Sequence, residues 1–147
     1  MNAPRISLAN LPTPLEPVPR LAEAFGGPQI WVKRDDLTGF GLSGNKVRKL
    51  EFHLAAALQS GAGTVITCGA VQSNHARATA LAAARVGLGT ILYLRSPDGT
   101  APEKATGNHL LQLVAGAECR FITPAHWDDR NAILAEAAVS HGNAWVI

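Results

Sequence analysis

A lysine at the end of a glycine-rich segment is the group in this sequence best suited to covalent chemistry. Lys46 follows the segment from Gly39 to Asn45 and stands at the start of a helical pattern. Glycine turns let backbone N–H groups approach a ligand, and the positive end of a helix dipole favours a bound anion. That dipole and the neighbouring cations Arg48 and Lys49 disfavour the ammonium form of the lysine. We therefore expect an amine suited to Schiff-base chemistry beside a site for an anionic cofactor.

The same basic cluster has a simpler interpretation. Lys46, Arg48 and Lys49 are also typical of the solvated face of a helix. Spacing alone leaves both interpretations open.

Two nucleotide-binding motifs are close to the glycine segment, but neither fits it. Gly39, Gly41 and Gly44 match G-x-G-x-x-G, a motif that needs an acidic residue roughly 20 positions later, at the end of the next strand. Here the next strand pattern, Thr64–Thr67, is followed by Cys68 and not by an acid. A P-loop needs a lysine directly after its last glycine, where this sequence has an asparagine. Both nucleotide sites are therefore disfavoured.

A second candidate turn follows the strand pattern Thr64–Thr67. Ser73 and Asn74 stand directly after Gln72, at the start of an alanine-rich helical pattern. Ligands bind at the carboxyl ends of parallel strands, so these side chains are well placed to meet one. Both residues are also typical helix N-caps, and the two roles are compatible. His75 titrates in the range of a general base, although a histidine on a first helical turn is more often a bystander.

Two motifs together resemble the paired signature of the D-cysteine desulfhydrase and 1-aminocyclopropane-1-carboxylate deaminase family. They are residues 43–51, SGNKVRKLE, and residues 66–77, ITCGAVQSNHAR. The resemblance extends from about Leu11 to the last residue. Members of this family are pyridoxal-phosphate enzymes of the tryptophan-synthase-β fold type. The resemblance therefore implies pyridoxal 5'-phosphate as the cofactor and a small amino acid as the substrate.

The resemblance also implies which residues bind the cofactor. Lys46 matches the lysine that forms the Schiff base with it, and Asn74 matches the asparagine that hydrogen-bonds its ring hydroxyl. Asn45 and Lys49 match positions near the cofactor and its phosphate.

A further set of matches concerns the substrate. Ser73 matches the serine placed next to the substrate and is, with Lys46, the second catalytic residue that the resemblance implies. Gln72, Asn74 and His75 complete the expected substrate-binding set.

The second motif most resembles the desulfhydrase branch of the family. The activity implied is α,β-elimination from D-cysteine, giving pyruvate, ammonia and hydrogen sulfide. The alternatives within the family are a 1-aminocyclopropane-1-carboxylate deaminase and an L-cysteate sulfo-lyase. An alternative of another class is a non-catalytic remnant, or one half of a split protein.

The elements that must position these groups alternate between strand and helix. Helical patterns cover Val47–Ser60, Asn74–Val86, Gly107–Ala115 and Asp128–Ser140. Strand patterns cover Thr64–Thr67, Thr90–Leu94, Glu118–Ile122 and Ala144–Ile147. Such alternation with short links predicts an α/β fold, a three-layer parallel sheet with helices on both faces. By resemblance this is a tryptophan-synthase-β-like fold, and an incomplete one.

The first 29 residues contain six of the nine prolines, so they cannot form a long helix. Leu15, Leu21 and Phe25 predict that this segment docks on a body. By resemblance, residues 1–48 are an N-terminal arm and the first strand of a larger cofactor domain. Residues 49–147 are most of a smaller α/β domain.

The strand pattern Ala144–Ile147 leads, in the family, into the C-terminal half of the larger domain. That half supplies the cup for the cofactor phosphate and the partner of the pyridine nitrogen. The resemblance therefore implies a truncated or split chain that is inactive alone, and a homodimer when full length.

Composition gives no case for a nucleic-acid or membrane partner, since 16% of the residues are charged and the formal net charge is +2. Cys68 and Cys119 are interpreted as reduced thiols, and with no targeting pattern we expect a cytoplasmic protein. The five histidines lack metal-ligand spacing, so no metal site is expected.

Overall fold

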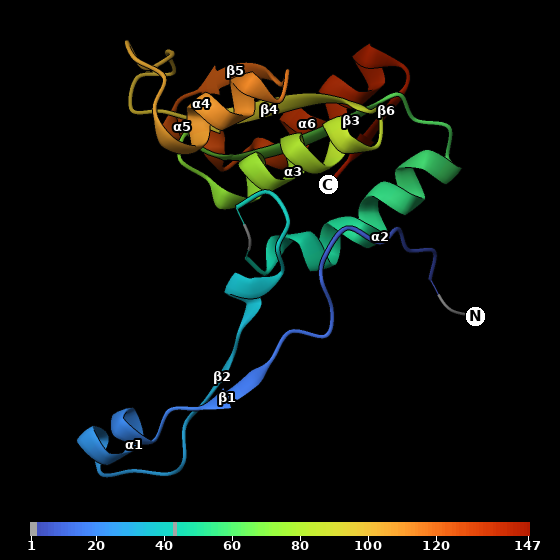
Figure 1. Ribbon diagram of the computed structural model, residues 1–147. Helices are drawn as coiled ribbons and strands as arrows, with labels where there is room; N and C mark the ends of the chain where they lie inside the picture. The colour runs from blue at the N-terminus through green and yellow to red at the C-terminus, as the bar shows by residue number, and fades with distance from the viewer. Residues whose placement is uncertain (1–2, 43) are drawn as a thin grey trace.

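The computed structural model describes residues 3–42 and 44–147 and consists of an α/β body from which a slender arm projects (Figure 1). Ser43 of the glycine segment lies outside the described residues. The body contains a four-stranded sheet with helices on both faces, and the arm contains a two-stranded ribbon and one short helix.

The sheet has the order β5-β4-β3-β6, and its strands are parallel throughout. Its members are β3 Thr64–Ala70, β4 Gly89–Arg95, β5 Glu118–Ile122 and β6 Ala144–Val146. The three-layer parallel α/β architecture predicted from the sequence is confirmed.

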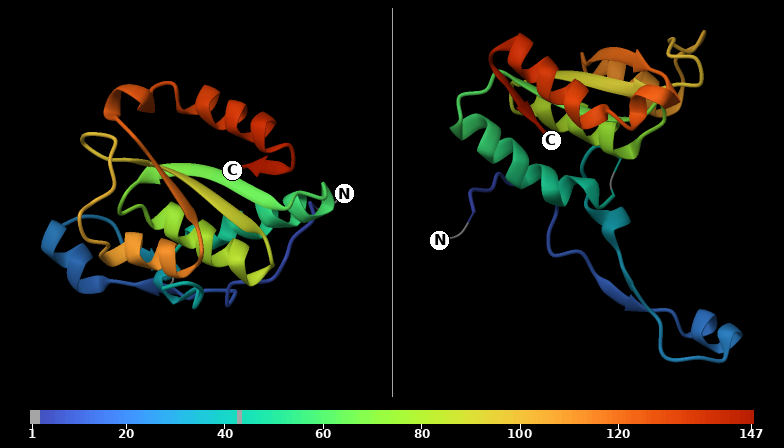
Figure 2. Two further views of the ribbon diagram at one scale, coloured as in Figure 1. Left: turned by 90° about the horizontal axis from the view of Figure 1, so that it is seen from above. Right: turned by 180° about the vertical axis from the view of Figure 1, so that it is seen from behind.

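Alternate residues of the central strand face opposite helical layers, as the two-residue period of a strand requires. Ile66 packs in one core cluster with Leu134 of α6 (Arg130–His141). Val65 packs in another with Ala78 and Ala82 of α3 (Asn74–Arg85). The small alanine side chains let α3 lie close to the sheet. The separation of α6 from α3 by the sheet is visible in Figure 2.

In the part of the chain that the structure describes, three further α-helices belong to the body. They are α2 Lys46–Gln59, α4 Gly107–Val114 and α5 Pro124–Trp127. Helix α2 packs mainly on α3, through a cluster that includes Leu50 and Leu54. It begins at Lys46, one residue earlier than the sequence pattern indicated. As a result, the candidate lysine is the first residue of a helix anchored in the core.

The arm consists of β1 (Leu15–Pro17) paired antiparallel with β2 (Trp31–Lys33), with α1 (Pro19–Phe25) between them. The prediction that this segment docks on the body through its apolar side chains is wrong. Leu15 is 59% exposed and Phe25 73% exposed, and α1 buries none of its residues. Apolar side chains in a sequence indicate a need for burial but not the surface that supplies it, and here the ribbon extends away from the sheet (Figure 1).

The segment before the arm does lie on the body, held by the buried carboxylate of Glu51. This carboxylate accepts hydrogen bonds from the backbone of Leu8 and Ala9, each at 2.8 Å, and pairs with Arg5 at 2.6 Å. Burial acts to raise the pKa of Glu51, but the hydrogen bonds from Ala9, Leu8 and Arg5 outweigh it and hold that pKa below its ordinary value. The N-terminal segment is therefore fixed to α2.

Two elements differ from their predicted bounds by more than one residue at an end. Strand β3 continues through Ala70 because Cys68, Gly69 and Ala70 pair with the end of β4. The single helix expected over Asp128–Ser140 is preceded by α5, whose start is set by a proline and by the Thr123 side chain, which accepts a hydrogen bond from the backbone of His126.

Candidate active site

A cavity of about 340 Å³ lies where the glycine segment and the start of α2 meet the start of α3. Its lining residues are Asp36, Leu42, Gly44, Asn45, Lys46, Asn74 and Arg77. The structure thus brings three predicted site residues together, Asn45, Lys46 and Asn74, from two distant stretches of sequence. The volume is within the range of small-molecule sites in proteins.

Hydrogen bonds to and from the backbone of Gly44 fix the loop that carries Lys46. The backbone N–H of Gly44 donates to the carbonyl of Asp35 at 2.9 Å, and the Thr38 hydroxyl donates to the carbonyl of Gly44 at 3.0 Å. Gly44 has φ of 105°, a left-handed conformation that favours glycine. The loop therefore enters α2 from a defined direction.

An ion pair between Asp35 and Arg48 closes the base of the same loop. Arg48 donates to both carboxylate oxygens of Asp35, and the Thr13 hydroxyl donates to the same carboxylate at 3.0 Å. Hydrogen bonds from Arg48 lower the pKa of Asp35 below its ordinary value, and Asp35 in turn raises the pKa of Arg48. The pair joins the residues before the loop to the first turn of α2, which Lys46 begins.

The side-chain amide of Asn74 has a defined orientation. Its Oδ1 accepts hydrogen bonds from Arg77 Nη1 at 3.1 Å and from Asn108 Nδ2 at 2.9 Å. A guanidinium group can only donate, so the oxygen of the Asn74 amide must face Arg77. Among the hydrogen bonds of the described residues, the Asn74 Nδ2 group makes none, and it belongs to a residue that lines the cavity. This leaves an N–H donor available to a ligand there.

Ser73 is the N-cap of α3. Its Oγ accepts a hydrogen bond from the backbone N–H of Ala76 at 3.2 Å, which is the capping role that the sequence left open. The side chain packs closely on Gly69, whose Cα has no room for a methyl group. Ser73 is half-buried and adjacent to Asn74, but it is not among the described residues that line the cavity.

Gln72 uses its side-chain amide to hold the start of α4. Its Oε1 accepts from the backbone N–H of Asn108 at 2.8 Å, and its Nε2 donates to the carbonyl of Thr106 at 3.0 Å. The amide that was expected to bind substrate is thus engaged with the backbone of Thr106 and Asn108.

His75 is a neutral histidine with a defined tautomer. The Thr67 hydroxyl donates to the carbonyl of Ile147 at 2.9 Å, so at 3.0 Å it accepts the proton of His75 Nε2. Burial, followed by the nearby cations Lys49 and Lys46, lowers the pKa of His75 to about 4. The residue therefore carries no charge near neutral pH.

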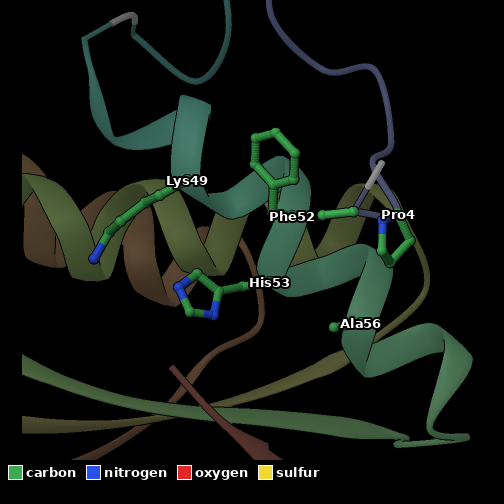
Figure 3. Close-up of a pocket in the computed structure, with 6 residues that line it drawn as sticks. Pro4, Lys49, Phe52, His53 and Ala56 are labelled. Atoms are coloured by element: carbon green, nitrogen blue, oxygen red, sulfur yellow. The ribbon is translucent and has the colours of Figure 1, made fainter. Parts of the chain in front are cut away.

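Lys49 faces a different hollow, shown in Figure 3, of about 330 Å³. Phe52, His53 and Ala56 of α2 line it together with Ala3 and Pro4 of the N-terminal segment. Burial and the neighbouring Lys46 cation lower the pKa of Lys49. Lys46 and Lys49 therefore interact electrostatically although they line separate concavities.

Arg77 and Asn108, which both hydrogen-bond to Asn74, were not assigned a role from the sequence. Arg77 lies inside the second motif, three residues after Asn74 and hence on the same helical face. This spacing could have identified Arg77 from the sequence as a neighbour of Asn74. No local signal exists for Asn108, which reaches Asn74 from another helix.

Among residues 3–42 and 44–147, no group of three histidine, cysteine or acidic side chains could hold a metal ion. Within the same ranges, each helix is too short or too polar to cross a lipid bilayer.

Comparison with protein families gives one match over nearly the whole chain. A family model described as pyridoxal-phosphate dependent enzyme matches residues 6–147. The chain is 51% identical over 118 residues to a Pyrococcus abyssi protein provisionally named a 1-aminocyclopropane-1-carboxylate deaminase, covering 80% of this chain and 34% of that protein. It is 51% identical over 110 residues to the D-cysteine desulfhydrase of Salmonella paratyphi A, covering 74% of this chain and 33% of that protein.

The fold of the chain also matches that of solved enzyme structures. A crystal structure described as an ACC deaminase homologue superposes with a TM-score of 0.78 at 40% identity, covering 98% of this chain and 44% of that one. Escherichia coli diaminopropionate ammonia lyase in apo form superposes with a TM-score of 0.71 at 26% identity, covering 94% and 40%. The chain spans about a third of the length of the curated relatives it matches.

Proposed function

The chain belongs to the pyridoxal-phosphate dependent enzymes, whose cofactor is pyridoxal 5'-phosphate, and from that premise we propose that Lys46 and Asn74 hold this cofactor in the cavity between α2 and α3. The observation that carries the proposal is the presence of a helix-start lysine and an available amide donor in one cavity. Fold and family alone would not single out these side chains.

The groups around the cavity fit an aldehyde that carries a ring oxygen and an anionic phosphate. Lys46 offers a primary amine for the aldehyde carbon, and Asn74 Nδ2 offers a donor for the ring oxygen. Arg77 and the N-terminus of α2 make the surroundings favourable to negative charge. When bound, the cofactor supplies an electron sink for negative charge that develops at the substrate α-carbon.

The residues of the chain would then bind the reactants and move protons. Lys46 would hold the cofactor through its amine, and the same amine would accept the α-proton of the substrate. Ser73, next to Asn74 at the start of α3, positions the substrate carboxylate or transfers a proton at the substrate. We further propose that Asn45 and Lys49 lie near the cofactor and its phosphate. Gln72 and His75 would lie near the substrate.

We propose α,β-elimination from D-cysteine as the reaction. The Cα–H and Cβ–S bonds break, sulfur leaves as hydrogen sulfide, and water replaces nitrogen on the carbon that becomes the keto group. One D-cysteine and one water thus give pyruvate, ammonia and hydrogen sulfide. Similarity to a desulfhydrase supports this reaction, and equal identity to a protein named as a deaminase supports ring opening of 1-aminocyclopropane-1-carboxylate as the alternative.

Borohydride reduction tests the cofactor assignment. The protein is incubated with pyridoxal phosphate, reduced, digested and mapped by mass spectrometry. The pyridoxyl group should be found on Lys46, should be absent from the Lys46→Arg variant, and should persist on Lys46 in Lys49→Arg. A label on Lys49 in the unaltered protein would overturn the assignment.

Product analysis separates the substrates. With the C-terminal half of the larger domain supplied, which the resemblance implies is needed for turnover, D-cysteine should release hydrogen sulfide and pyruvate, whereas 1-aminocyclopropane-1-carboxylate would release 2-oxobutanoate and L-cysteate would release sulfite. Release of 2-oxobutanoate alone would replace the desulfhydrase proposal with the deaminase.

We also propose that a further polypeptide covers the arm, as in a homodimer. The support is the exposure of Leu15, Leu21, Phe25 and Trp31, apolar side chains that water does not favour. The proposed division into residues 1–48 and 49–147 likewise rests on the separation of the ribbon from the sheet. Light scattering of the purified protein should give a multiple of 15.4 kDa. A chain that is labelled at Lys46 but turns over none of the three substrates, even with the C-terminal half of the larger domain supplied, would support the non-catalytic alternative.

A further inference from the structure

Two segments that are distant in the sequence meet in one hydrogen-bonded cluster beside the cavity. Its members are Gln72 before α3, Asn74 and Arg77 on α3, and Asn108 on α4. Arg77 is only 8% exposed, and its Nη1 donates to the side-chain oxygens of both asparagines.

The orientation of the Asn108 amide is determined twice. Its Oδ1 accepts from Arg77 Nη1 at 2.9 Å, and its Nδ2 donates to the carbonyl of Gln72 at 2.8 Å. Arginine cannot accept and a carbonyl cannot donate, so neither contact survives an exchange of the amide oxygen and nitrogen. Asn108 therefore presents N–H, and not oxygen, to Asn74.

The Asn74 amide is determined by the same logic. Both groups that face its oxygen, Asn108 Nδ2 and Arg77 Nη1, are obligate donors in this cluster. A half-turn of the Asn74 amide would place its NH2 group against two donors and would point its oxygen at the ligand. The cluster thus directs the NH2 group of Asn74, and not its oxygen, toward the cavity.

We propose that Arg77 and Asn108 are positioning residues that hold the Asn74 amide with its N–H directed at the ring oxygen of the cofactor. This inference rests on the proposed function for the identity of the ligand, but the orientation itself does not. Two donors on one oxygen also restrain the motion of the amide, so the hydrogen bond to the ligand is prepared before the ligand arrives.

The first measurement needs no cofactor. The side-chain ¹⁵N order parameter of Asn74, identified by its loss in Asn74→Ala, is measured in the cofactor-free protein. It should be high in the unaltered chain, lower in Asn108→Leu and Arg77→Met, and lowest in the double variant. An unchanged order parameter in the double variant would overturn the positioning role.

A matched control separates positioning from a loosened α4. Gln112 lies on the same helix, is fully buried, and donates to the carbonyl of Val71 at 3.2 Å without a hydrogen bond to Asn74. Gln112→Leu should lower stability but leave the Asn74 order parameter unchanged. Circular dichroism confirms folding, and Asn108→Leu, at a half-buried position, preserves the test if Arg77→Met fails to fold.

The second measurement uses the cofactor. The double variant should bind pyridoxal phosphate about tenfold more weakly than Gln112→Leu, the loss expected for one hydrogen bond, and should shift the absorption band of the bound cofactor. A mobile Asn74 with the affinity and band of the control would overturn the link to the cofactor. If the unaltered protein bound no cofactor even with the C-terminal half of the larger domain supplied, the proposed function would fail, while the order parameters would still decide the positioning role.

Discussion

Arg48 donates two parallel hydrogen bonds to the carboxylate of Asp35, from Nε to Oδ2 at 2.8 Å and from Nη2 to Oδ1 at 2.6 Å. The carbonyl of the same aspartate accepts the backbone N–H of Gly44. Asp35 therefore links the residue two positions before Lys46 to the residue two positions after it. This link fixes the backbone on both sides of Lys46, the candidate cofactor-binding lysine.

Arg48→Lys should weaken cofactor binding because an ammonium group cannot reproduce the two parallel bonds. A small displacement of Lys46 should reduce the affinity for pyridoxal phosphate by roughly tenfold to a hundredfold. Absorbance titration measures the effect.

The control for this change is Arg120→Lys. Arg120 pairs with Glu118 at 2.6 Å on β5, and neither residue lines the cavity. Its substitution should leave the affinity unchanged. Equal affinities in the two variants would mean that the Asp35 pair does not position Lys46.

Ser73→Ala should lower both stability and turnover. Loss of the N-cap should cost about 1 kcal/mol of unfolding free energy, and loss of the hydroxyl should reduce the rate by roughly a hundredfold. Thr123→Ala removes the equivalent cap of α5 and should show the stability loss alone. If the two variants matched in turnover as well as in urea midpoint, Ser73 would be a cap without a catalytic role.

The neutral state of His75 should make stability depend on pH in a defined window. Its pKa is about 4 in the folded chain against an ordinary value of 6.5, so the unfolded chain binds the proton more readily. Its contribution is complete above about pH 6.5 and is lost as the pH falls toward 4. The loss should be on the order of 2 kcal/mol, with solvent screening allowed for.

Urea denaturation between pH 7.5 and 4 measures this effect, using roughly even steps across the titration range of histidine. His75→Gln keeps an N–H donor for Thr67 but cannot titrate, so its stability should decline less over the same window. If the unfolding free energy of the two proteins declined equally with falling pH, the pH dependence would not come from His75.

The sequence identified the layers of the body and the two turns that form the cavity, because both depend on local patterns. Glycines before Lys46 and a cap before the alanine-rich helix are local signals for where helices begin. The end of β3 was missed because Cys68, Gly69 and Ala70 have weak strand preference and are extended by pairing with β4.

Contacts between elements were beyond such patterns. Asn108 lies 34 residues from Asn74, and only the packing of α4 beside α3 brings their amides together. The exposure of Phe25 could not be predicted for the same reason. The sequence shows that this side chain is apolar, but not which surface would cover it. Sequence reasoning could thus name candidate reactive groups, but not the groups of other elements that contact them.

The close contact between Gly69 and Ser73 provides a last test of how the strand positions the candidate serine. A methyl group on Gly69 would lie 2.6 Å from both Cβ and Oγ of Ser73, closer than such atoms pack. Gly69→Ala should therefore displace Ser73, lower the unfolding free energy by about 1–3 kcal/mol and reduce turnover. Gly63→Ala is the control, because its methyl group would meet only the end of the Asn143 side chain, at 3.2 Å.

A second substitution separates the clash from a general strand effect. Adding Ser73→Gly to Gly69→Ala removes both atoms that the methyl group meets, and glycine at an N-cap costs only a few tenths of a kcal/mol. Urea denaturation should then show recovered stability without recovered turnover, since the hydroxyl is gone. Adding Ser73→Ala retains the Cβ and should leave the stability low. If neither Ser73→Gly nor Ser73→Ala restored stability, the defect would lie in the strand itself. Gly69 would then not position Ser73.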